Sequence, residues 1–213
     1  KVIFVPYGDV DRTLLKKIIS STGMDDYLIF DGSPMDLVSA AWGMKINREN
    51  GGTEIIVDHS FVVKSVGTVA LGFVIRGNVK KHQELYVSES ARKAQVRSIQ
   101  MQDEDQESAD TGSRVGLALK NADTDEVTRG TVMSDTEIRM SGKFEGEITF
   151  HSSIRNRPAG RTEIFVSDLM RFQRGFYENS EIILDSAIPV VKEQAVLSSQ
   201  VMTPRVFGKI RIR

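Results

Sequence analysis

The chain has 213 residues, of which 40% are hydrophobic, enough to bury one large core or two to three small ones. The absence of cysteine excludes disulfides, a thiolate nucleophile and a cysteine-bound metal. No apolar run approaches the length of a membrane span, so we expect a cytoplasmic protein with no membrane partner. The formal net charge is −1. This balance excludes a general, strongly basic nucleic-acid binder, and any contact to RNA should be local.

Residues 1–50 have the pattern of an α/β segment. Residues 2–5 form a continuous apolar run, which predicts a strand buried on both faces. Apolar residues at helical spacing follow, then a second apolar run at 27–30, and Ser33 with Pro34 has the order of an N-cap and first helical turn. This β-α-β-α order predicts parallel strands. Two strands and two helices are too few to close a stable core alone.

The middle of the chain is rich in short strands. In residues 66–74 nearly every side chain is apolar, β-branched or glycine, and bulky and small residues alternate, so one face is bulky and the other small. Gly67 and Gly72 within this run predict a bulge, a corner or a close backbone approach, as in a small closed barrel. The predicted inward positions of two later strands are Val96, Ile99, Val115, Leu117 and Leu119.

Four strings of residues follow one another in a specific order. They read D-H-S-F-V-V-K-S-V-G-T-V-A-L-G-F-V at 58–74, V-R-S-I-Q at 96–100, G-S-R-V-G-L-A-L at 112–119 and R-G-T-V at 129–132. Composition alone fits any short-stranded antiparallel barrel, whereas this set resembles domain 2 of translation elongation factors such as elongation factor Tu and archaeal SelB. The resemblance covers roughly residues 54–134. It implies a β-barrel that holds the acceptor end of an aminoacyl-tRNA and touches the small ribosomal subunit.

The resemblance also implies an organisation into three parts. Residues 1–50 would be a partial or degenerate GTP-binding-like α/β segment, residues 51–136 the domain 2 barrel, and residues 137–213 a barrel similar to domain 3. The predicted fold class is therefore mainly β, with two small antiparallel β-barrels preceded by a partial β-α-β-α segment. In residues 137–213 a half-exposed strand is expected at 144–150, and three further short strands at 163–166, 182–184 and 195–197.

The family's nucleotide motifs are altered or missing. The guanine-recognition sequence N-K-x-D would follow the first strand, where this chain reads Y-G-D-V-D, so Asp9 or Asp11 would have to supply the carboxylate. No G-x-x-x-x-G-K-[ST] phosphate loop occurs. Either the phosphate-binding half lies upstream, because the chain starts at Lys1 rather than at Met, or the domain has decayed. GTP and Mg²⁺ are expected only in the first case, and whether the protein is an enzyme stays open.

Three groups of basic residues are candidate RNA contacts. In the domain 2 segment the resemblance points first to Arg97, Arg114 and Arg129, although Arg129 could instead bind carbonyl oxygens at a turn. In the last third, which carries 12 Lys/Arg against 9 Asp/Glu, the second group surrounds a Pro-Gly loop, and the third forms one face of the final strand. An ordinary solvated strand face is the alternative for the third group. The second group is Arg155, Arg157 and Arg161, and the third group is Lys209, Arg211 and Arg213.

Other polar residues point to no chemistry. His59 is expected to fix a strand start, His82 to lie exposed near a turn and His151 to end a strand, and their spacing does not suit a metal. The acidic residues 103–107 predict a solvated loop rather than a calcium loop. We therefore expect no metal site and no catalytic residue in this chain.

Taken together, these features favour a cytoplasmic translation-elongation-factor-like protein that binds aminoacyl-tRNA, the ribosome or both through its barrels. One alternative is an intact translational GTPase whose catalytic half lies outside this sequence. Another is a pseudo-factor that acts as a protein-interaction module.

Overall fold

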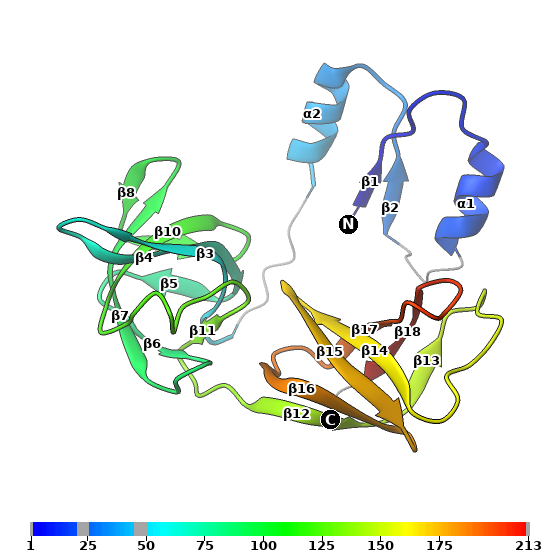
Figure 1. Cartoon of the computed structure of the whole chain (residues 1–213). Helices are drawn as coiled ribbons and strands as arrows, with labels where there is room; N and C mark the ends of the chain where they lie inside the picture. The colour runs from blue at the N-terminus through cyan, green and yellow to red at the C-terminus, as the bar shows by residue number, and fades with distance from the viewer. Residues whose placement is uncertain (1, 21–25, 45–50, 212–213) are drawn as a thin grey trace. The chain divides into compact units, whose positions relative to one another are not determined.

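The computed structural model describes residues 2–20, 26–44 and 51–211 of the chain (Figure 1). The chain forms two compact units, residues 1–47 and residues 48–213. The first unit is the α/β segment, and the second contains two seven-stranded β-sheets and a two-stranded ribbon, all antiparallel. The predicted mainly-β fold with a preceding β-α-β-α segment is confirmed.

The first unit contains four elements in the predicted order: β1 (Val2–Phe4), α1 (Arg12–Ser20), β2 (Tyr27–Ile29) and α2 (Pro34–Trp42). The two strands pair in parallel. Ser33 caps α2 as predicted, because its hydroxyl accepts from the Asp36 N–H while the Asp36 carboxylate accepts from the Ser33 N–H. The expectation that the first strand is buried on both faces is wrong. Val2 is exposed, and neither described strand of this unit contains a buried residue.

Residues 54–134 form a closed sheet, which we call the first barrel. Its sheet order is β10-β4-β3-β11-β6-β7-β8, and an additional pairing of β10 with β7 closes the ring. A two-stranded ribbon of β5 and β9 is attached to it. The strands are β3 (Glu54–Val63), β4 (Gly67–Arg76), β5 (Asn78–Lys80), β6 (Glu84–Val87), β7 (Lys93–Met101), β8 (Glu104–Gln106), β9 (Ser108–Asp110), β10 (Arg114–Lys120) and β11 (Val132–Ser134).

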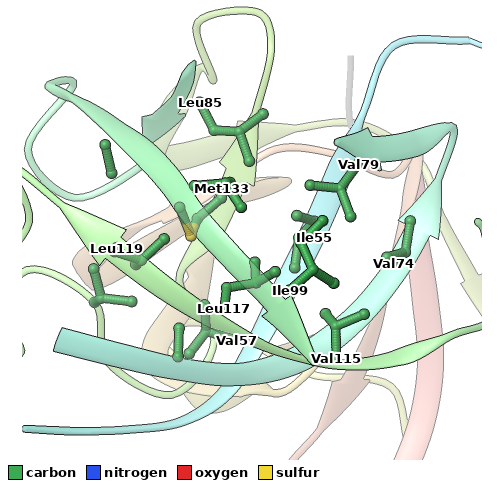
Figure 2. Close-up of a cluster of buried hydrophobic side chains, with 14 of the residues drawn as sticks. Ile55, Val57, Val74, Val79, Leu85, Ile99, Val115, Leu117, Leu119 and Met133 are labelled. Atoms are coloured by element: carbon green, nitrogen blue, oxygen red, sulfur yellow. The ribbon is translucent and has the colours of Figure 1, made fainter. Parts of the chain in front are cut away.

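Aliphatic side chains from the strands and from the β5–β9 ribbon fill the first barrel (Figure 2). All five predicted inward residues of β7 and β10 are buried, as are Ile55, Val57 and Met133 from the strands that complete the ring. Each such side chain contributes about 1.5–3 kcal/mol of burial before conformational entropy is subtracted. The packed core thus holds in place the strands that form the outer wall of the barrel.

Strand β4 places its small residues inside and its bulky residues outside. Ala70, Gly72 and Val74 are buried, whereas Leu71 and Phe73 are only half-buried on the outer wall. Gly72 is the close backbone approach that the sequence predicts. A Cβ atom at this position would lie under 3.0 Å from the Ile56 carbonyl oxygen on the adjacent strand.

Residues 140–211 form the second sheet, whose order is β12-β16-β15-β14-β17-β18-β13. Its end strands β12 and β13 follow one another in the chain across Gly146 and Glu147, so the sheet curls around its own core. Phe207 and Ile164 are fully buried in this core. The described residues of β12 and β13 do not pair with each other. The strands are β12 (Met140–Glu145), β13 (Ile148–Phe150), β14 (Thr162–Asp168), β15 (Arg171–Glu178), β16 (Glu181–Pro189), β17 (Gln194–Ser198) and β18 (Val206–Arg211).

Three local expectations need correction. The single strand expected at 144–150 is two strands, because Gly146 and Glu147 separate β12 from β13. The acidic segment 103–107 is not a plain loop, since β8 pairs with β7 in a hairpin. His59 lies in the middle of β3 rather than at its start. Strand β15 went unpredicted, because its charges and its glycine obscure the alternation. The boundary between the parts at residue 136 stays a prediction.

Neither helix in the described part of the chain is long and apolar enough to cross a membrane.

Candidate nucleic-acid interface

Two β-bulges shape the outer wall of the first barrel. Between β3 and β4, Val57 pairs with Gly72 and His59 pairs with Leu71, which leaves Asp58 without a cross-strand partner. Between β7 and β10, Ser98 pairs with Ala118 and Val96 pairs with Leu119, which leaves Arg97 without one. Bulges re-aim side chains and are frequent at functional sites. The two extra residues, one acidic and one basic, both lie in the family-like strings.

Asp58 holds two of the predicted RNA-contacting arginines together. Its carboxylate lies 3.4 Å from Arg129 Nη1 and 3.9 Å from Arg114 Nη2. The Asp58 side chain is 27% exposed, whereas both arginine side chains are more than half exposed. One carboxylate therefore orients two guanidinium groups and neutralises only half of their charge, so the cluster keeps a net positive charge toward solvent. The contact that the structure shows for Arg129 is this ion pair, and its alternative role at a turn stays a prediction.

Arg97 is held differently. Its Nη1 donates a hydrogen bond to the Val66 carbonyl oxygen at 3.2 Å, in the turn between β3 and β4. A carbonyl leaves the guanidinium charge intact, and the side chain is exposed. Arg97 is thus the carbonyl-binding arginine of the three.

Apolar side chains lie beside the arginines on the same wall. Arg114 pairs with Phe73 across β10 and β4, and its guanidinium lies 5.8 Å from the ring centroid. The next outward pair is Gly116 with Leu71, and a Cβ at Gly116 would be 3.4 Å from Leu71 Cδ2. The missing side chain at Gly116 leaves Leu71 accessible. Guanidinium groups next to half-exposed apolar surface suit the charged backbone and flat bases of RNA.

The basic residues of the second sheet are more dispersed. Arg157 lies over the Phe150 ring at 4.9 Å and Arg161 over the Phe176 ring at 4.2 Å, and Arg155 is exposed in the same loop. Lys209 and Arg211 share the exposed face of β18 as predicted.

Their charges are also partly compensated. Arg211 pairs with Glu193 at 3.0 Å, which favours the solvated-face alternative for that residue. Arg213 lies outside the described residues.

The two aspartates considered for guanine recognition differ in role. Asp11 caps α1, because its Oδ1 accepts from the N–H groups of Thr13 and Leu14 at 2.9 and 3.0 Å. The cap uses one of the two carboxylate oxygens of Asp11. Asp9 is exposed in the loop before the helix. A guanine-binding role for either aspartate, and the binding of GTP and Mg²⁺, stay predictions.

In the described ranges, no group of three His, Asp or Glu side chains is arranged to hold a metal ion. The three histidines are far apart in the fold: His59 lies beside Phe61 on the outer wall, His82 is exposed in a turn, and the His151 ring accepts from the Ser153 N–H.

The sequence does not single out Asp58 as a member of the candidate site. Its type and position are visible in the D-H-S string, but only the bulge shows that it faces Arg114 and Arg129.

The chain is similar to several known proteins. Residues 67–134 match the family model of elongation factor Tu domain 2. An uncharacterized protein of Methanocaldococcus jannaschii is 41% identical over 149 residues, which covers 70% of this chain and 48% of that protein. The selenocysteine-specific elongation factor of the same organism is 27% identical over 127 residues, or 58% of this chain and 27% of that factor.

Solved structures extend the likeness to the whole chain. Translation elongation factor SelB from Methanococcus maripaludis in its apo form has a TM-score of 0.77 at 20% identity, covering 94% of this chain and 54% of that one. The same factor in complex with the GTP analogue GPPNHP gives 0.77 at 17%, covering 100% and 58%. A bacterial selenocysteine-specific elongation factor gives 0.74 at 18%, covering 99% and 39%.

Most of the first barrel is therefore similar to domain 2 of elongation factor Tu. The chain as a whole has the fold of the corresponding part of SelB-type elongation factors. It spans about half the length, or less, of the curated relatives it matches.

Proposed function

We propose that this protein binds RNA of the translation machinery, and specifically the acceptor end of an aminoacyl-tRNA, on the outer wall of its first barrel. The observation that carries the proposal is the pairing of Arg114 and Arg129 with Asp58 on a wall where Leu71 and Phe73 are half-exposed. Arg97 adds a third exposed guanidinium to the same barrel, at the turn between β3 and β4. The match to elongation factor Tu domain 2 supports the same role. The ribosome is the second RNA partner that this fold suggests.

The interface should be small and sensitive to salt. With about three phosphates neutralised, log K should fall against log[salt] with a slope of roughly −2, using about −0.7 per contact for single-stranded ends. If each arginine contributes about 1 kcal/mol, removing all three lowers affinity roughly 100-fold.

A gel-shift titration of aminoacyl-tRNA at low salt tests the proposal. Wild type is compared with the triple variant Arg97→Ala, Arg114→Ala and Arg129→Ala. A matched triple variant that removes three ion-paired surface cations elsewhere controls for net charge: Arg92→Ala, Lys143→Ala and Arg174→Ala. Only the first triple should lose binding. Absence of wild-type binding, or equal binding by the wall variant, would contradict the proposal.

A translational GTPase is the second candidate function, because SelB of Methanococcus maripaludis, with the same fold, was solved with a GTP analogue. Nucleotide binding by the complete gene product separates the two. Micromolar GTP binding supports the hydrolase, and none at millimolar GTP supports a factor that acts without nucleotide.

A further inference from the structure

One arginine of the second sheet contacts the first barrel close to the proposed RNA-binding wall. Arg171 is the first residue of β15, directly after a tight turn in which Leu169 has a positive φ of 50°. Its Nε donates a hydrogen bond to the Gly130 carbonyl oxygen at 2.9 Å, and its Nη2 pairs with the Glu89 carboxylate. Gly130 and Glu89 both belong to the first barrel. We call Arg171, Glu89 and Gly130 the clasp.

The clasp is largely enclosed. The side chains of Arg171 and Glu89 are 19% and 22% exposed. Burial lowers the pKa of Arg171, in keeping with a guanidinium that has left bulk water. A side chain this enclosed is poorly placed to meet an RNA phosphate, so any effect it has on RNA is indirect.

Gly130 is shaped to receive the arginine. Its φ of +85° suits glycine, and a Cβ there would lie under 3.0 Å from Arg171 Cγ and 3.0 Å from Arg171 Nε. Any other residue at 130 would thus strain the turn and displace the guanidinium.

The clasp connects to the RNA-binding wall through the turn at 128–131. The Gly130 N–H donates to the Val57 carbonyl oxygen at 2.8 Å, and the Val57 N–H donates to the Thr131 carbonyl oxygen at 2.9 Å. Val57 immediately precedes the bulged Asp58, and Arg129, which immediately precedes Gly130, reaches the Asp58 carboxylate. Arg171 therefore fixes the turn that presents Arg129.

We infer that Arg171 is a positioning residue: it holds the turn at 128–131 so that Arg129 keeps the position from which it meets RNA. The RNA part of this inference rests on the function proposed above. It assigns to the second sheet a specific role in that site, namely setting the geometry of one arginine across the contact between the sheets.

The first experiment needs no RNA. Amide hydrogen exchange is measured by NMR on the full chain for wild type, Arg171→Ala and the control Arg174→Ala, which removes an exposed arginine of the same strand. In Arg171→Ala the Gly130 N–H should exchange at least 10-fold faster, while the Val96 N–H, bonded to Gln83 O in the same barrel, should be unchanged. Equal Gly130 exchange in wild type and Arg171→Ala would overturn the inference.

If Arg171→Ala unfolds, Glu89→Gln replaces it, because this change removes the ion pair and keeps the hydrogen bond to Gly130 O. A smaller selective rise in Gly130 exchange is then expected, and no rise overturns the inference. Arg171→Lys keeps a charge for Glu89 but lacks the planar fork that also reaches the carbonyl, so it should rescue only part of the protection.

The second experiment is a double-mutant cycle on aminoacyl-tRNA affinity. Arg171→Ala and Arg129→Ala should each weaken binding several-fold, and the double variant should be no weaker than Arg129→Ala alone, because Arg171 acts through Arg129. Multiplying effects would overturn the indirect role. If wild type binds no aminoacyl-tRNA, the proposed function fails, while the exchange experiment still decides whether Arg171 fixes the turn.

Discussion

Replacing Gly72 by alanine should strongly destabilise the first barrel. A Cβ at this position would be under 3.0 Å from the Ile56 carbonyl oxygen, 3.1 Å from its carbon and 3.3 Å from Val57 Cα. All three atoms are backbone, and β3 cannot retreat easily because Ile55 and Val57 anchor it in the core. The strands must therefore separate locally at the bulge.

The cost can be worked from these contacts. Loosening about two ladder hydrogen bonds loses about 2 kcal/mol, and overpacking adds about 1–3 kcal/mol. We expect a loss of about 3–5 kcal/mol, which lowers the melting temperature of the barrel by about 10 °C or more. Differential scanning calorimetry of the full chain measures this shift.

Gly116→Ala is the matched control on the neighbouring strand. Its Cβ would meet Leu71 Cδ2 at 3.4 Å and Gln100 Cβ at 3.9 Å, which are ordinary contacts with movable side chains. Because alanine restricts the unfolded chain more than glycine does, this variant should melt within about 2–4 °C of wild type, corresponding to at most about 1 kcal/mol. Equal melting shifts for the two variants would refute the argument that the β3 backbone excludes a side chain at Gly72.

Three further outcomes are expected. Burial raises the pKa of Asp168, which is 6% exposed with one unpartnered oxygen, so wild-type stability should fall as pH rises through that raised pKa. In calorimetry, Asp168→Asn should therefore melt at a higher temperature than wild type at pH 7 and lose this gain toward pH 4. A gain that is independent of pH would argue against burial of the charge. Hydrogen bonds from the Ser33 hydroxyl and N–H lower the pKa of Asp36. The stability that these bonds contribute is present above about pH 4 and is lost as pH falls through the lowered pKa. An NMR titration should show a higher Asp36 pKa in Ser33→Ala, and an unchanged midpoint would contradict the capping box. Phe207→Ala should cost about 3–5 kcal/mol in urea unfolding, because Phe207 is fully buried, while Phe172→Ala should cost much less, because Phe172 is 62% exposed; similar losses would place the core elsewhere.

The sequence predicts the longer strands of the first barrel well, because they are runs of alternating or β-branched residues and the family-like strings fix their order. It does not predict the short, polar strand β8. It does not predict which face of β4 points inward. Alternation of period two distinguishes two faces but not their direction, and the bulky face with Leu71 and Phe73 turns out to be the outer one. The small face of β4 points inward because the backbone of β3 lies close to Gly72. This close approach depends on the partner strand and is therefore not visible in the sequence of β4.

The remaining features depend on contacts between distant residues. The bulge at Asp58 exists only in the pairing of β3 with β4, and the bond from Arg171 to Gly130 joins residues 41 positions apart. Strand β15 is not predicted for a related reason. Its sequence mixes charged and aromatic residues, and the strand is defined by its pairing with β14 on one side and β16 on the other. Local patterns therefore predicted the scaffold, whereas the groups that orient Arg114 and Arg129 could be identified only from tertiary structure.

The two bulges have a consequence for how such a wall can change. A residue in register on a strand is constrained by its cross-strand neighbour and by the core behind it, but Asp58 and Arg97 have no such neighbour. Substitutions at these two points should disturb the hydrophobic interior least while altering the charge presented to a bound molecule most. A family built on this barrel could thus diverge in what it recognises by exchanging the residue at either bulge, and leave the folding of the domain almost untouched.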